Sequence, residues 1–252
     1  TLTVGPVTAD RSLSSEIPAH APDELKFTVR AMSADRVASV DVAVLRNGES
    51  VAAASVTNGE GKVGVQYGDR VRLDVHPAPD SVFVGPTEHV VGTNDVAVNV
   101  KCLPTVLDYI GWSVTGEVAC VASDVAYVTA STVRLEKGGW YAVADGTLAL
   151  GTLELAGTAN LILLDDTDLV VTGSTGWAAV TVARSGRLNV FAARSGGTGR
   201  LALAGGAGAA AVSGDLAVYG GTVVAQGGAG TESAVDGEVV RCPKMILRLG
   251  ES

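Results

Sequence analysis

The sequence predicts an all-β protein in which a small antiparallel β-sandwich is followed by a parallel β-helix, a solenoid of stacked coils. Short apolar runs separated by glycine-containing turns extend along the chain, and these runs lack a helical period. The chain has 32 glycines among 252 residues but only 4% aromatic residues, so its core must be built from small aliphatic side chains. A Gly-Gly-Ala-Gly phrase occurs twice near the C-terminal end, which is typical of a repeat architecture.

Residues 1–22 are polar and contain prolines, and they predict an extended lead-in. Strict alternation begins at Leu25, where apolar residues occupy every second position, as in a strand with one buried face. Asn47-Gly48 is a strong signal for a two-residue hairpin turn. Further strands are expected at 37–45, 49–56, 62–67, 70–76 and 96–100. Strands this short and evenly spaced predict a β-sandwich over residues 23–102.

The centre of this region reads VASVDVAVLRNGESVAAASVTNGEGKVGVQYGDRVRLDV. It resembles the carboxypeptidase-regulatory or Cna-B type of prealbumin-like β-sandwich, and the resemblance extends over about residues 25–101. Modules of this type are usually spacers in surface and secreted proteins. The resemblance therefore implies a structural role for the first domain.

The next segment connects the two predicted domains, and we place their boundary near Leu103. We expect a short helix within 104–112 that caps the second domain, and a strand within 125–133. A cap is physically required because the open end of a solenoid exposes apolar side chains and unpaired strand edges. The parallel β-helix with its N-terminal cap is therefore predicted over residues 103–252.

The doubled glycine phrase defines the repeat. Residues 205–208 recur at 227–230, an offset of 22, and the flanking apolar residues recur with them. After one slipped residue, Val212 aligns with Val235. Stacked β-coils of about 20 residues explain such a period.

An earlier pair of segments suggests a shorter step. Residues 159–163 and 168–171 match 178–182 and 187–190 at an offset of 19. Together the two steps predict five or six coils, in which equivalent strands run parallel because they repeat in the same chain direction.

Residues 138–240 include the phrases GGWYAVADGTLALGTLELAGTANLILLDDTDLVV and GRLALAGGAGAAAVSGDLAVYGGTVVAQGGAG. They resemble a Gly-rich right-handed β-helix module of bacterial cell-surface proteins. The chain departs from that pattern at 211–213 and 234–236, where the family favours Gly-Ile-Gly. The resemblance implies a right-handed β-helix, an adhesin-like role, and a location outside the cell or on the bacterial cell surface.

The charge of the chain disfavours two kinds of partner. The formal net charge is −9, which disfavours nucleic acid and anionic membrane surfaces because both require basic patches. No apolar run is long enough to cross a membrane, so no membrane insertion is expected. Both ends look trimmed, and we expect the chain to be a fragment of a longer protein.

The three cysteines lack the spacing of a zinc site. Cys102 and Cys120 form a disulfide across a short loop in one interpretation, which leaves Cys242 unpaired. In the other interpretation all three are buried thiols. The sequence leaves both open.

The densest acidic cluster contains Asp165, Asp166 and Asp168. Adjacent carboxylates on a solenoid can hold Ca²⁺, the one cofactor that the sequence suggests, or act as general acid and base. The alternative is a turn in which aspartates accept hydrogen bonds from backbone N–H groups. The 19-residue alignment places Arg184 and Arg187 opposite the cluster, so no carboxylate ladder is expected and the turn is favoured.

The candidate ligand-binding residues are Trp177, Arg184, Arg187 and Arg194. Trp177 lies in a glycine-containing turn, where an exposed indole can stack on a sugar ring. The arginines, with Arg200, either form a stripe for an acidic glycan or are solvated turn residues. They occur at spacings of 3 to 7 residues without a ladder of acidic partners, which favours the second interpretation.

Signals for catalysis are weak. All three histidines (His20, His76 and His89) precede the predicted solenoid, and no Gly-X-Ser-X-Gly motif is present. A polysaccharide lyase or hydrolase on this fold requires the three aspartates to converge with Arg187 in one groove.

We therefore expect a non-catalytic fragment of a bacterial cell-surface or secreted protein that binds a glycan or a host or surface protein. A phage receptor-binding fibre is the alternative binding protein, and a homotrimer in solution would favour it. A polysaccharide lyase or hydrolase is the enzymatic alternative. The sequence does not determine the oligomeric state.

Overall fold

The computed structural model describes residues 25–250 except 33–34, 58, 145, 232 and 243–245, and the predicted lead-in over 1–22 lies outside this part. Every regular element of the described part is a β-strand, which confirms the all-β prediction. None of the described residues lies in a helix with the length and apolar character needed to cross a membrane. The chain divides into two compact units. The N-terminal unit holds the described residues up to 32 with 39–75 and 86–100, and the C-terminal unit holds 35–38, 76–85 and the described residues from 101 onward.

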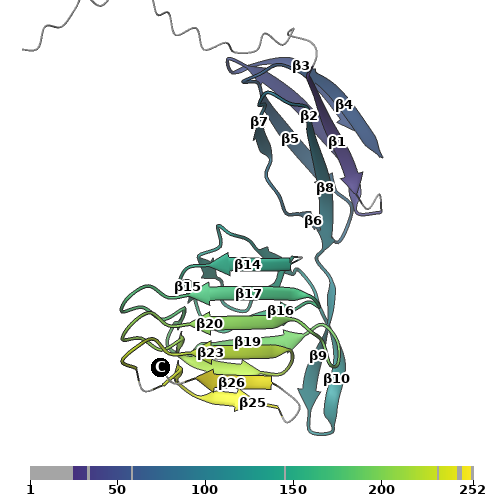
Figure 1. Cartoon of the computed structure of the whole chain (residues 1–252). Helices are drawn as coiled ribbons and strands as arrows, with labels where there is room; N and C mark the ends of the chain where they lie inside the picture. The colour runs from purple at the N-terminus through teal and green to yellow at the C-terminus, as the bar shows by residue number, and fades with distance from the viewer. Residues whose placement is uncertain are drawn as a thin grey trace, which may run out of the picture. The chain divides into compact units, whose positions relative to one another are not determined.

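The first eight strands form two four-stranded sheets, with the orders β4-β1-β8-β6 and β3-β2-β5-β7 (Figure 1). The pairs with a defined register are antiparallel. The strands are β1 (Leu25–Met32), β2 (Val37–Arg46), β3 (Glu49–Val56), β4 (Glu60–Val65), β5 (Arg70–Pro77), β6 (Ser81–Phe83), β7 (Glu88–Val90) and β8 (Val96–Pro104). Both sheets contribute fully buried side chains, such as Phe27 from β1 and Val71 from β5.

Alternation in the sequence explains these strands. In β1, Phe27 and Val29 are buried while Lys26 is exposed. Asn47 and Gly48 have φ values of 53° and 88°, the geometry of a tight hairpin turn between β2 and β3, so the predicted hairpin is confirmed. The expected strands match β1 to β5 and β8. β6 and β7 have three residues each, and a pattern that short gives no signal.

One buried carboxylate links two elements of the N-terminal unit. Asp69, 2% exposed, accepts hydrogen bonds from the Arg46 guanidinium at 2.9 and 3.0 Å and from the backbone N–H of Gln66 at 2.8 Å. The hydrogen bonds from Arg46 favour the charged form more than burial opposes it, so the pKa of Asp69 lies below its ordinary value. The end of β2 is thereby held against the turn before β5.

Asp69→Asn is expected to destabilise the N-terminal unit by about 2 kcal/mol at neutral pH, because a charge-assisted pair becomes a neutral contact. The pKa of Asp69 is lower in the folded than in the unfolded chain. Its stabilisation is therefore complete above the unfolded pKa and is lost as the pH falls through the folded pKa. Calorimetry of the whole chain from neutral pH into the acid range measures this loss. All three tryptophans lie in the C-terminal unit, so tryptophan fluorescence identifies the unfolding transition of that unit. The remaining calorimetric transition then belongs to the N-terminal unit.

Glu88→Gln, at an exposed position of β7, is the matched control and should leave the stability of the N-terminal unit unchanged. If Asp69→Asn retained the acid sensitivity of the wild type, other groups would control the acid unfolding of this unit.

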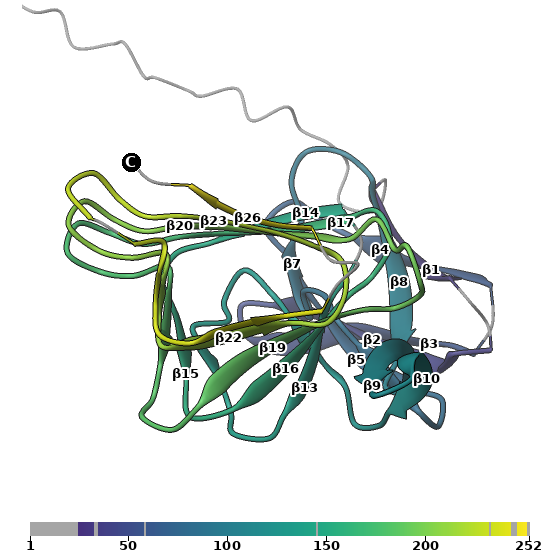
Figure 2. The same cartoon turned by 90° about the horizontal axis from the view of Figure 1, so that it is seen from below.

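The C-terminal unit contains three sheets of parallel strands (Figures 1 and 2). Sheet 1 consists of β11 (Ala126–Val128), β13 (Trp140–Val143), β16 (Ala159–Leu163), β19 (Arg187–Ala192), β22 (Asp215–Val218) and β25 (Val239–Arg241). Sheet 2 consists of β14 (Gly146–Leu150), β17 (Thr167–Thr172), β20 (Arg200–Ala204), β23 (Thr222–Gln226) and β26 (Ile246–Gly250). Sheet 3 consists of β12 (Arg134–Leu135), β15 (Leu153–Leu155), β18 (Val180–Val182), β21 (Val212–Ser213) and β24 (Val235–Asp236).

From β13 onward the chain visits these sheets in a fixed order, from sheet 1 to sheet 2 to sheet 3, and then returns to sheet 1 one strand further along. We call one such passage a coil. Strands of successive coils pair in parallel, as the repeat predicted.

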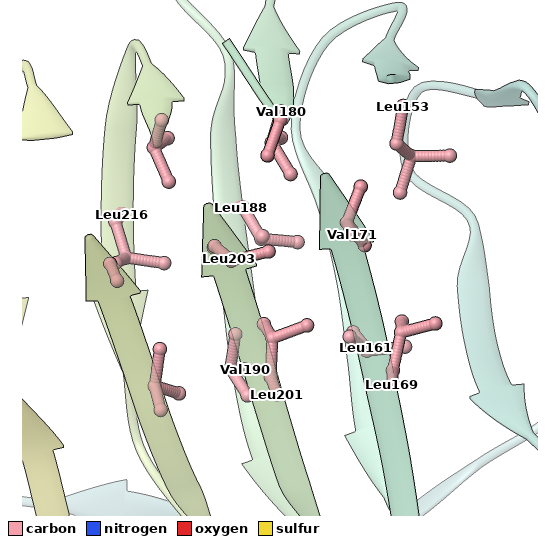
Figure 3. Packing of buried hydrophobic residues seen from close by; sticks show 14 of the residues in the cluster. Leu153, Leu161, Leu169, Val171, Val180, Leu188, Val190, Leu201, Leu203 and Leu216 are labelled. Atoms are coloured by element: carbon pink, nitrogen blue, oxygen red, sulfur yellow. The ribbon is translucent and has the colours of Figure 1, made fainter. Parts of the chain in front are cut away.

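Side chains from all three sheets meet in one aliphatic cluster (Figure 3). Paired strands are in register, so equivalent residues stack in columns: Leu161 pairs with Val190, which pairs with Val218. In sheet 2, Leu169 pairs with Leu201. All five are buried, and among the described residues no aromatic side chain belongs to the buried set of this cluster, in agreement with the composition.

The register confirms the 22-residue step and contradicts the 19-residue step. Leu201 pairs with Val223, which is the same offset as that of the doubled glycine phrase. Ala159, however, pairs with Leu188 and not with Ala178. Ala178 lies two residues before β18 of sheet 3, whereas Ala159 begins β16 of sheet 1. The 19-residue alignment was wrong because strands of all three sheets carry similar apolar patterns.

The segment expected to hold a capping helix forms a β-hairpin instead. Its strands, β9 (Leu107–Ser113) and β10 (Gly116–Ala122), pair antiparallel, and Ile110 of β9 pairs with Ala192 of sheet 1. Tyr109 packs against Trp140 and Phe191, with ring centroids 4.6 and 4.9 Å apart. The helix expectation is wrong because this segment covers the aromatic side chains of sheet 1 as a strand. The strand expected within 125–133 is the short β11.

All three cysteines are free thiols, so Cys102 and Cys120 do not form a disulfide. Cys102 and Cys242 are buried, and burial raises the pKa of both thiols. Cys120 is half-buried. The buried-thiol interpretation therefore describes two of the three.

Glycine loops connect sheet 2 to sheet 3 and stack on each other. The Gly206 N–H donates to the carbonyl of Trp177 at 3.0 Å, and the Gly228 N–H donates to the carbonyl of Ala209 at 2.9 Å. A Cβ atom at Gly206 would overlap the carbonyl group of Ser174. The repeated phrase therefore requires glycine because the loop backbones touch.

Gly206→Ala is expected to destabilise the C-terminal unit by about 2–4 kcal/mol, because the added methyl group must push the adjacent loop away. Denaturant titration followed by tryptophan fluorescence measures the change. Gly151→Ala is the control, since a Cβ atom there meets nothing within 4 Å. Equal stability of the two variants would mean that the loops do not need this close stacking.

Candidate functional site

Outward side chains of the coils also form columns, because neighbouring parallel strands lie about 4.8 Å apart. One column begins at Arg187, which pairs with Asp215 in the next coil, and continues to Glu238. The Arg187 guanidinium lies 3.9 Å from the Asp215 carboxylate and 3.2 Å from that of Glu238. The acidic partners of Arg187 are therefore Asp215 and Glu238, and not the aspartates that the 19-residue alignment had placed opposite it.

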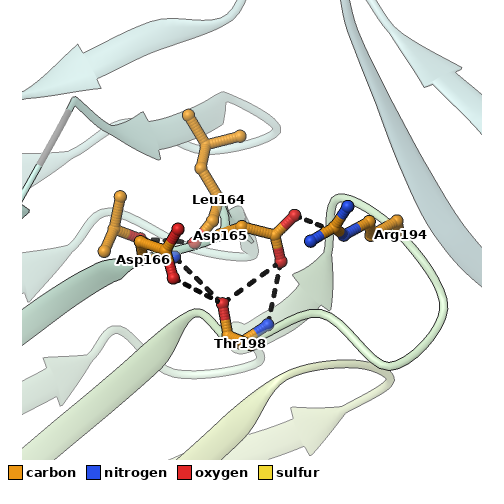
Figure 4. Close-up of polar contacts among 6 residues, drawn as sticks. Leu164, Asp165, Asp166, Arg194 and Thr198 are labelled. Atoms are coloured by element: carbon orange, nitrogen blue, oxygen red, sulfur yellow. Dashed lines mark hydrogen bonds and ion pairs between the residues drawn. The ribbon is translucent and has the colours of Figure 1, made fainter.

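The predicted acidic cluster is likewise bonded to residues of the following coil (Figure 4). Asp165 accepts a hydrogen bond from the backbone N–H of Thr198 at 2.8 Å and pairs with Arg194 at 2.6 Å. Asp166 accepts one from the Thr198 hydroxyl at 3.1 Å, and its own N–H donates to that hydroxyl at 3.0 Å. Asp165 and Asp166 lie in a turn, and these contacts bond that turn to the loop of the following coil. The turn position and the backbone N–H bonded to Asp165 agree with the favoured interpretation of the cluster.

Asp168 points to a different partner. Its carboxylate lies 2.9 Å from the guanidinium of Arg200, its register neighbour in sheet 2. Among the described residues there is no group of three or more His, Cys, Asp or Glu side chains arranged to hold a metal ion. The geometry of the three aspartates therefore gives no support to a Ca²⁺ site.

The convergence that an active site requires does not occur among these residues. Arg187 is bonded to Asp215 and Glu238, while Asp165 and Asp168 are bonded to Arg194 and Arg200. Arg184 is exposed in the turn between β18 and β19. The predicted acidic and basic residues thus separate into several ion pairs.

A groove of about 620 Å³ lies over the glycine loops and sheet 3. Three consecutive coils line it with equivalent sets of residues: Gly176, Trp177, Ala178 and Thr181; Gly208, Ala209, Ala210 and Ser213; and Gly230, Thr231, Ser233 and Asp236. Trp177 is 61% exposed. Ala209 and Thr231 occupy its place in the next two loops, so smaller side chains leave space beside the indole.

The column of polar side chains in this groove differs from the ion-paired columns that contain Arg187 and Asp168. Thr181 pairs with Ser213, which pairs with Asp236, so their side chains share one face of sheet 3. Within the part of the chain that the structure describes, the side chains of these three residues make no hydrogen bond or ion pair with protein groups. Polar groups that remain unpaired beside an exposed indole are available to a ligand.

Sequence reasoning singled out Trp177 but not the groove. The missing signal was a third copy of the glycine loop, in which Gly173 and Gly176 take the places of Gly205 and Gly208. This copy lies further from the next one than the assumed period of about 20 residues allows, and the alignment therefore passed over it.

Comparison with known proteins gives no relatives: no family model, no curated protein and no solved structure matches this chain.

Thr198→Val is expected to destabilise the C-terminal unit by about 1–2 kcal/mol, because the hydroxyl group that bridges Asp165 and Asp166 is removed. Thr222→Val, at a half-buried position of β23, is the matched control and should have a smaller effect. Denaturant midpoints from tryptophan fluorescence compare the two. Equal midpoints would mean that the hydroxyl bonds of Thr198 add nothing to stability.

Proposed function

We propose that this chain is a non-catalytic part of a bacterial cell-surface or secreted protein, and that it binds carbohydrate through the groove beside Trp177. In this proposal the C-terminal unit is a right-handed parallel β-helix and the N-terminal unit is a β-sandwich spacer. The single observation that carries the binding role is the exposed indole next to the unpaired polar column.

The architecture is supported by the cyclic order of the three parallel sheets and by the in-register pairing of successive coils. A crossover between parallel strands of one sheet is right-handed in nearly all proteins, which supports the handedness. Two antiparallel four-stranded sheets with buried residues on both support the sandwich.

Carbohydrate is the ligand class that this chemistry fits. The flat face of an indole packs on the C–H face of a sugar ring, while hydroxyl and carboxylate side chains bond to the ring hydroxyls. Thr181, Ser213 and Asp236 offer such groups in consecutive coils. A flat apolar surface flanked by polar groups matches a sugar better than it matches a purely apolar ligand.

The non-catalytic role is supported by the content of the groove. Glycoside hydrolysis normally uses two carboxyl groups that flank the scissile bond. Among the described residues, the lining contains one carboxylate, Asp236, and no histidine. Binding without turnover is the function these residues support best.

Trp177→Ala is expected to weaken binding to a glycan by tenfold or more, because the stacking surface is lost. An array of neutral and acidic glycans identifies the ligand, and calorimetric titration then measures its affinity. Tyr67→Ala is a matched control, because Tyr67 is also 61% exposed but lies in the N-terminal unit.

The control variant should bind as the wild type does. If the array contains no ligand, or if Trp177→Ala binds with unchanged affinity, the groove is not a carbohydrate site. Turnover of a bound glycan would contradict the non-catalytic role.

A further inference from the structure

We infer that the groove takes an extended, uncharged polysaccharide segment that crosses three coils, and that Glu154 and Asp236 discriminate against carboxylated glycans. This inference rests on the proposed function and adds the class and length of the ligand. It differs from an acidic-glycan site built from arginines, which the spacing of Arg184 to Arg200 had offered as an alternative.

The charge of the groove argues against an anionic ligand. Of the residues that the structure describes, no lysine or arginine lines it, and Asp236 is the one charged residue that does. Glu154 pairs with Thr181 at the other end of the same column. The two hydroxyl groups of Thr181 and Ser213 therefore stand between two exposed carboxylates.

Two nearby arginines are bonded to other carboxylates. Arg134 is the register neighbour of Glu154, but its guanidinium bonds to Glu136 at 3.2 Å. Arg187 belongs to the column of Asp215 and Glu238. Recognition of a sugar carboxylate normally uses a guanidinium or ammonium group, and the described lining of the groove offers neither.

The hydroxyl groups of Thr181 and Ser213 suit a neutral sugar, because each can both donate and accept a hydrogen bond. The Asp236 carboxylate accepts hydrogen bonds from neutral sugar hydroxyls but repels a uronic acid. The same column thus favours one class of glycan and disfavours the other.

The length of the ligand follows from the arrangement of the contacts. Trp177 belongs to the first coil of the groove and Asp236 to the third. Two coil steps correspond to roughly 10 Å along the stack. A single sugar ring on the indole does not reach the third coil, whereas an oligosaccharide that runs along the stack contacts both ends.

The test uses hexasaccharides of β-1,4-linked glucose and mannose, each compared with the hexasaccharide that carries a carboxylate at C6. Titration calorimetry of the whole chain is carried out at low and high salt. We expect a neutral hexasaccharide to bind about fivefold more tightly than its carboxylated counterpart at low salt, with a smaller difference at high salt. The disaccharide of the same series should bind more weakly than the hexasaccharide.

Glu154→Gln combined with Asp236→Asn is expected to remove the difference by strengthening the binding of the carboxylated sugar. Glu88→Gln combined with Asp108→Asn changes the net charge equally at exposed positions outside the groove, and it should retain the difference. Circular dichroism of each variant verifies its fold.

The outcomes separate the two proposals. If the carboxylated hexasaccharide binds as tightly as the neutral one and Trp177→Ala weakens both, the inference is wrong and the proposed function stands. If the two double variants behave alike, these carboxylates do not set the preference and the inference is also wrong. If none of the four hexasaccharides binds although the glycan array contains a ligand, the inference is wrong and the proposed function stands. If the array contains no ligand, or if binding does not depend on Trp177, the proposed function fails and the inference fails with it.

Discussion

In-register pairing of parallel strands is the constraint on which the C-terminal unit depends. Each residue lies about 4.8 Å from its equivalent in the next coil, so its environment is decided by a residue that is distant in the sequence. Inside the coils this produces aliphatic columns such as Leu161 with Val190. Outside, it requires polar neighbours to be compatible, and the amide of Asn189 donates to that of Asn160 at 2.9 Å. Charged residues follow the same requirement, since Asp168 stacks on Arg200 and the neighbouring carboxylates of Asp215 and Glu238 share the guanidinium of Arg187.

The same constraint explains what the sequence could and could not predict. Alternation and turn chemistry are local, so β1 and the hairpin at Asn47-Gly48 were predicted in place. The 22-residue step was also found, because glycine is required wherever two loop backbones touch, as at Gly206 and Gly228. Both signals come from positions at which few other residue types fit the backbone.

Features that depend on how strands of successive coils align could not be predicted from local patterns. The apolar pattern of a strand in sheet 1 is similar to that of a strand in sheet 3, so the pattern alone does not identify its neighbour. The wrong 19-residue step then placed Arg187 opposite the aspartates and hid its partners Asp215 and Glu238.

The groove was missed for the same reason. Thr181, Ser213 and Asp236 form a column only when the strands of sheet 3 are aligned with one another, and the successive steps between these strands are unequal. The β9–β10 hairpin was missed because its packing partners, Trp140 and Phe191, lie in later strands.

The groove is best understood as a part of this surface where stacking leaves groups unpaired. An exposed ion pair adds at most about 1 kcal/mol, so leaving Asp236 without a protein partner costs the fold little. Exposing an indole costs more: a tryptophan buries about 150–250 Å² in a packed site, and each Å² contributes about 25 cal/mol. Ala209 and Thr231 are the side chains that the next two loops carry where Trp177 stands, so the loop itself does not require an aromatic residue. Folding thus does not require the large apolar side chain of Trp177, nor does it use the polar groups beside it. Binding of a ligand explains this combination more simply than stability does.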